Sequence, residues 1–102
     1  MDTIEMYEKI ENIVCSDKTS KGYKIVSNKR VGYICMTLSG YKHYIKIWNL
    51  KEVSICYGDI DSEWRLPGKI LLKSELGEMD GETKIKVIKG LFRIMKGLEK
   101  EI

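Results

Sequence analysis

Alanine and glutamine are absent from this sequence of 102 residues, and proline, histidine and phenylalanine occur once each. Lysine and isoleucine are abundant instead, a bias that arises in AT-rich genomes and, more loosely, under selection for heat tolerance. The bias therefore identifies no class of protein. The other absences are more informative, because each of them argues against a class.

No run of apolar residues approaches the roughly 20 that a membrane-spanning helix needs. The segment from Met1 to Glu5 also lacks the basic and then apolar order of a secretory signal. We therefore expect a soluble, cytoplasmic protein that makes no membrane contact. Its length and its hydrophobic content of 43% predict a single domain that spans residues 1–102.

Cysteine and glycine patterns argue against bound cofactors. Cys15, Cys35 and Cys56 form an odd set without a close pair, so the sequence predicts neither a disulfide framework nor a zinc site. The glycine-containing segment 77–81 precedes a predicted helix but is acidic, and its carboxylates would repel a phosphate. We expect no cofactor and no metal.

Groups suited to catalysis are also scarce. The single histidine, His43, shares its side of a predicted strand with Ile45 and Ile47, which is typical of a structural histidine rather than a general base. A pair between His43 and Cys35 would need both on one face, and a regular hairpin places them on opposite faces. We therefore expect that this protein is not an enzyme.

Two periodicities define the predicted fold. Apolar residues recur at helical spacing over residues 3–15 and again from Glu82 to about Glu101. Between these helices a period of two predicts an antiparallel meander of four strands, or of five if residues 69–73 add an edge strand. The four main strands are expected near residues 23–28, 32–38, 42–49 and 52–58. The fold class is thus α+β, with the long C-terminal amphipathic helix packed on one face of the sheet.

The predicted C-terminal helix has an apolar arc close to half its circumference, wider than one contact needs. Either it lies between the sheet and the first helix, or part of it meets a second copy, which makes a homodimer through this helix one hypothesis. Cations gather on its other side, as a solvated face or a surface for phosphates. They are Lys86, Lys89, Arg93, Lys96 and Lys100.

A basic, aromatic strand is the first candidate site. Seven cations and no acid occur from Lys21 to Lys51, and they overlap the clearest strand pattern. One face of that strand alternates cations with aromatic rings, which suits the phosphates and bases of single-stranded nucleic acid. The residues of this predicted basic face are Lys42, Tyr44, Lys46 and Trp48, with Tyr33 on the neighbouring strand.

The first hypothesis is therefore a non-enzymatic module that binds nucleic acid or a nucleoprotein. The alternative for these residues is that the first helix covers this face, so that Tyr44 and Trp48 belong to the core and the lysines reach its edge. On the preceding strand, Ile34, Met36 and Leu38 are the set expected to be packed, whereas Tyr33, Cys35 and Thr37 are not.

An acidic loop gives a second hypothesis from another class. Asp59, Asp61 and Glu63 lie beside Trp64, and a tryptophan within a polar rim is a common anchor in protein interfaces. The loop lacks the glycine and the distal glutamate of a calcium-binding loop. These residues fit a protein–protein interaction or inhibitor protein, such as phages and mobile elements encode against a bacterial enzyme or defence complex.

Overall fold

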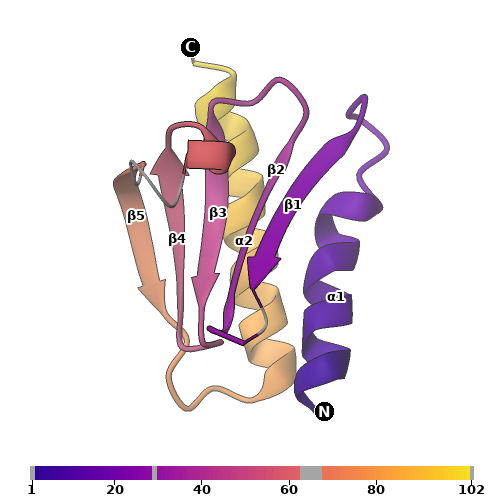
Figure 1. The fold of residues 1–102 in the computed structure, drawn as a ribbon, viewed down its shortest axis with the longest axis vertical. Helices are drawn as coiled ribbons and strands as arrows, with labels where there is room; N and C mark the ends of the chain where they lie inside the picture. Colours follow the sequence, from indigo (N-terminus) through magenta and orange to yellow (C-terminus); the bar gives the residue numbers. More distant parts are fainter. Residues whose placement is uncertain (1, 29, 63–67, 102) are drawn as a thin grey trace.

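The computed structural model describes residues 2–28, 30–62 and 68–101. It has two layers, a five-stranded antiparallel sheet and a pair of helices on one face of that sheet (Figure 1). The predicted α+β fold is confirmed, and the fifth strand is present. The elements are α1 (Thr3–Cys15), β1 (Tyr23–Asn28), β2 (Tyr33–Leu38), β3 (His43–Trp48), β4 (Glu52–Tyr57), the short 3-10 helix η1 (Ile60–Ser62), β5 (Lys69–Glu75) and α2 (Gly81–Glu99).

The strands follow one another across the sheet in sequence order, because short connections join each strand from β1 to β4 to the next in the series. Asn49 and Leu50 both adopt positive φ, 51° and 53°, and Lys51 N–H donates to Trp48 C=O at 2.9 Å. This is the backbone of a type I′ hairpin turn, which matches the twist of the strands it joins. Gly40, between β2 and β3, also has a positive φ, of 83°.

The core lies between the sheet and the helices. Alternation directs Ile45 and Ile47 of β3 toward this side, together with alternate residues of β2 and β4. Both helices contribute to the same cluster. Its helical members are Met6, Tyr7, Ile10, Val14, Ile88, Leu91, Phe92 and Met95. The two helices therefore share one face of the sheet, and the alternative in which α1 covers the opposite face is wrong.

A second, smaller cluster lies on the opposite face of the sheet. It contains Tyr33, Cys35, Tyr44 and Cys56 from the strands, and Ile60 of η1 packs against them. Figure 1 shows η1 on the near side of the sheet and α2 on the far side. Every residue of β2 is buried as a result, so the expectation that only alternate residues of β2 belong to a core is wrong.

Polar contacts fix both ends of α2. Asp80 caps its first turn, where the carboxylate accepts from Thr83 N–H at 2.7 Å and this contact lowers the pKa of Asp80. At the other end Glu99 accepts from His43 Nδ1 at 2.6 Å and from Lys42 N–H at 3.0 Å. His43 is buried, as expected of a structural histidine, and it joins β3 to the end of α2.

Candidate functional site

The structure separates the residues of the predicted basic face. Tyr44 is only 1% exposed, and its hydroxyl accepts from Gly68 N–H at 3.1 Å. Tyr33 is buried in the same cluster. Neither ring offers an open face on which a base could stack, because η1 and Gly68 lie against this part of the sheet.

Trp48 is the most accessible ring of the set. It is 37% exposed and stacks on Tyr33, with ring centroids 6.4 Å apart and planes inclined by 24°. Lys46 is half-buried, and Lys42 is exposed but precedes β3. The structure therefore brings Trp48 and Tyr33 together. It does not expose the predicted cations and aromatic rings side by side on one open surface.

Carboxylates share this face of the sheet. Glu52 lies opposite Trp48 in the β3–β4 pairing, and Lys73 of β5 pairs with Glu52 at 2.9 Å and with Glu75 at 3.6 Å. Negative charge is thus present beside Trp48 as well as positive charge. A role for this face in nucleic-acid binding stays a prediction.

The acidic loop is described in part. Asp59 and Asp61 are exposed, Asp61 N–H donates to the Asp59 carboxylate at 2.9 Å, and Lys24 of β1 pairs with Asp61. Glu63 and Trp64 lie outside the described residues. The protein-binding role of this loop stays a prediction too.

A concave groove lies between α1 and α2. One part has a volume of about 450 Å³ and is lined by Lys9, Asn12, Ile13, Ser16, Glu82, Ile85, Lys86 and Lys89. A second part, about 250 Å³, shares Ile13, Ser16 and Lys89 with the first and continues to Asp17, Phe92, Arg93 and Lys96. We call the two together the interhelical groove.

Helical spacing explains how these residues come to line one groove. On α1, Asn12 and Ile13 follow Lys9 by three and four positions, and the C-cap Ser16 follows Ile13 by three. On α2 the lining residues recur similarly from Glu82 to Lys96, so each set occupies one side of its helix. The helices lie side by side with their N-termini at the same end (Figure 1). At 1.5 Å per residue the α2 wall is about 21 Å long.

The groove has an apolar floor and a cationic rim. Ile13 and Ile85 are half-buried, and Phe92 is 7% exposed. Among the described residues, none of the rim cations Lys9, Lys86, Lys89 and Arg93 forms an ion pair. The acids of the lining are Glu82 and Asp17, and Asp17 is already paired, so the groove is positively charged overall.

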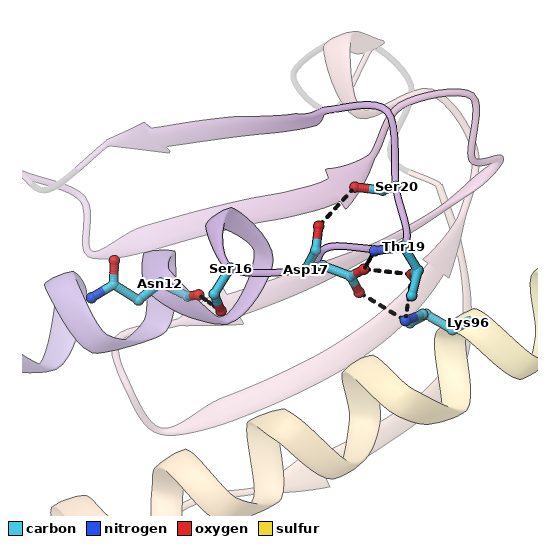
Figure 2. A network of polar contacts seen from close by, with 6 residues as sticks. All are labelled: Asn12, Ser16, Asp17, Thr19, Ser20 and Lys96. Atoms are coloured by element: carbon cyan, nitrogen blue, oxygen red, sulfur yellow. Dashed lines mark hydrogen bonds and ion pairs between the residues drawn. The ribbon is translucent and has the colours of Figure 1, made fainter.

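Asp17 closes one end of the groove through a polar network (Figure 2). Its carboxylate accepts from Thr19 N–H at 2.8 Å, from the Thr19 hydroxyl at 2.5 Å and from Lys96 Nζ at 2.8 Å. The Asp17 side chain is 6% exposed. The hydrogen bond from Lys96 and those from Thr19 lower the pKa of Asp17 from its ordinary 3.8 to about 2. The network ties the α1–β1 connection to α2.

We expect Asp17→Asn to reduce stability in a pH-dependent way. A carboxylate whose pKa is lowered on folding stabilises the protein above its unfolded pKa, and this contribution is lost as the pH falls through the folded pKa. The variant should be about 1–2 kcal/mol less stable at pH 7. The difference should shrink between pH 4 and pH 2. Urea unfolding across this range measures it, and Glu78→Gln, an exposed change, is the control.

No protein-family model, no curated protein and no solved structure matches this chain. Within residues 2–28, 30–62 and 68–101, no His, Cys, Asp and Glu side chains gather in a group that could hold a metal ion. Neither helix in these ranges combines the length and apolar content needed to cross a bilayer. Arguments about function therefore rest on the fold and the interhelical groove.

Sequence reasoning identified one wall of this groove and missed the other. The cations of α2 were predicted to gather on one side of the helix, and Lys86, Lys89, Arg93 and Lys96 do so. Lys9, Asn12 and Ile13 of α1 were not singled out. The available signal was Lys9, the one cation on a helix whose other charged residues are all acidic.

Proposed function

We propose that this protein is a non-enzymatic binding module that holds an acidic partner in the interhelical groove. The observation that carries the proposal is the set of rim cations that form no ion pair among the described residues, Lys9, Lys86, Lys89 and Arg93. Like charges held around a concave, partly apolar surface repel one another and focus a positive potential. An acidic partner would relieve this repulsion and would be steered toward the groove.

Charge reversal on α2 tests this function. Labelled poly-L-glutamate should bind at low salt, and its affinity should fall as salt screens the interaction. The double variant Lys89→Glu/Arg93→Glu should weaken binding by about ten-fold or more, because it removes two cations and adds two acids to the rim. Fluorescence anisotropy measures the affinity. The matched single variants are Lys89→Glu, which should also weaken binding, and Lys51→Glu at an exposed position in the turn after β3, which should have little effect.

The outcome can contradict the proposal in two ways. No binding at low salt would show that the rim cations are a solvated surface. Equal weakening by Lys51→Glu and by Lys89→Glu would show that only the net charge of the protein matters, without a site in the groove.

Nucleic acid at Trp48 is the second candidate, because Trp48, which stacks on the buried Tyr33 of β2, is the accessible aromatic residue of β3. Its marker, in a Trp64→Phe background, is quenching of Trp48 emission by a single-stranded oligonucleotide, which poly-L-glutamate would not cause. The homodimer through α2 also stays a hypothesis. Ile94, which lies outside the groove lining, is 46% exposed and is the apolar residue of α2 most available for such a contact.

A further inference from the structure

We infer that the partner segment is an acidic amphipathic α-helix of about four turns that lies in the interhelical groove. This inference rests on the proposed function, since it names the kind of acidic partner that the groove takes. Its basis is the apolar floor of the groove, the two helices that form its walls and the spacing of its rim cations, rather than charge alone.

The floor of the groove argues for apolar side chains on the partner. Ile13 of α1 and Ile85 of α2 are half-buried and line the groove between the rim cations. A partner that met only the rim would leave these side chains in water. A helix with an apolar stripe would cover them and would place acids on both flanks of the stripe, where the cations lie.

The same floor argues against nucleic acid. Bases bind single-strand sites by stacking on open aromatic faces. The one aromatic residue in the lining is Phe92, which is 7% exposed, and Lys96 Nζ lies 6.0 Å from its ring centroid. The groove therefore offers phosphates their cations but offers bases no stacking surface.

The geometry of the walls suits a helix. Two helices side by side form the seat on which a third helix packs, at interaxial distances of about 8–10 Å. Ser16 donates its hydroxyl to Asn12 C=O at 2.5 Å, so this small side chain is turned back onto α1. The α1 wall is therefore low at its Ser16 end, where a helix can approach closely.

The rim cations also have helical spacing. Lys86, Lys89 and Arg93 are separated by three and then four residues along α2, and Lys9 lies on the opposite wall. A partner helix with acids at matching intervals on one flank would meet the α2 cations in successive turns. A further acid on its other flank would meet Lys9. This pattern defines the sequence expected of the partner.

Two synthetic peptides of about 14 residues test the inference. One places leucines in a helical stripe with glutamates on both flanks, and the other is a scramble of the same composition and charge. The amphipathic peptide should bind about ten-fold more tightly than the scramble, and it should gain helical circular dichroism on binding. A single-stranded oligonucleotide of similar charge should bind no better than the scramble. In NMR titrations, the methyl groups of Ile13 and Ile85 should shift only with the amphipathic peptide.

A matched pair of variants on α2 distinguishes the loss of a contact in the groove floor from a general effect on folding. Ile85→Ser should weaken binding of the amphipathic peptide by about ten-fold and leave poly-L-glutamate binding unchanged. Ile94→Ser, the same substitution outside the groove, should leave both unchanged. If Ile85→Ser does not fold, the variant Lys89→Glu/Arg93→Glu still tests binding in the interhelical groove, because both cations are exposed. This variant should abolish the shifts of the Ile13 and Ile85 methyl groups.

Three results would overturn the inference. If the scramble or the oligonucleotide binds as tightly as the amphipathic peptide, the groove takes any polyanion, and the proposed function stands without a helical partner. The same conclusion follows if Ile85→Ser folds and binds the amphipathic peptide normally. If poly-L-glutamate itself does not bind, the proposed function and the inference both fail.

Discussion

Replacing Tyr44 by alanine should lower the free energy of unfolding by about 3–5 kcal/mol. The ring is 1% exposed and packs with Tyr33, Cys35, Cys56 and Ile60 on the face of the sheet opposite the helices. Its removal would leave a cavity beneath η1, and the loss of packing around that cavity adds to the lost burial of the ring. Urea unfolding followed by far-UV circular dichroism measures the change.

Two control variants test whether the loss of stability comes from the burial of the Tyr44 ring. Tyr44→Phe keeps the ring and removes the hydroxyl that accepts from Gly68 N–H, so it should cost only about 1 kcal/mol. Trp48→Ala, in the same face of β3 but 37% exposed, should cost less than Tyr44→Ala. A loss below about 1 kcal/mol for Tyr44→Ala is the size expected of a surface residue, and it would contradict the packing described for this cluster.

Tyr44 also shows where strand periodicity stops being informative. Alternation correctly assigned Tyr44 and Ile45 to opposite faces of the sheet, and the structure shows that α2 lies on the Ile45 side. Periodicity cannot say what lies over each face. The cover over Tyr44 comes from Ile60 and Gly68, in a connection that has no repeating pattern from which its position could be read.

The interhelical groove shows the same limit for helices. A helical wheel predicted the cationic side of α2, because that depends on α2 alone. The second wall depends on how α1 lies against α2, which is fixed by the sheet that both helices cover. Asp17 and Lys96, which close one end of the groove, are 79 residues apart in the sequence. No local pattern relates such residues.

His43 was interpreted as a structural histidine from its place on the Ile45 side of the strand, and its burial bears this out. Its partner was not predicted. Glu99 lies in the last turn of a helix with several charged residues, and nothing in the sequence separates it from the exposed Glu101. Glu99 differs from Glu101 because the position of α2 across β3 brings Glu99 to the start of β3.

We expect Glu99→Ala to lower the free energy of unfolding by about 2–4 kcal/mol. The carboxylate is 15% exposed and accepts from His43 Nδ1 and from Lys42 N–H. Its loss would leave the imidazole of His43, itself 5% exposed, without its acceptor beneath the end of α2. A buried donor without an acceptor costs more than the net value of the hydrogen bond it has lost. Urea unfolding at neutral pH measures the loss.

A matched control and a double-mutant cycle separate the contact from the change of charge. Glu101→Ala removes the same charge from an exposed position two residues further on, and it should change stability by less than about 0.5 kcal/mol. If Glu99 acts through His43, the loss in the double variant His43→Ala/Glu99→Ala should fall short of the two single losses added together by about 1–2 kcal/mol. Additive losses would mean that Glu99 stabilises the protein through Lys42 N–H alone, and that the contact with His43 contributes nothing to the attachment of α2 to β3.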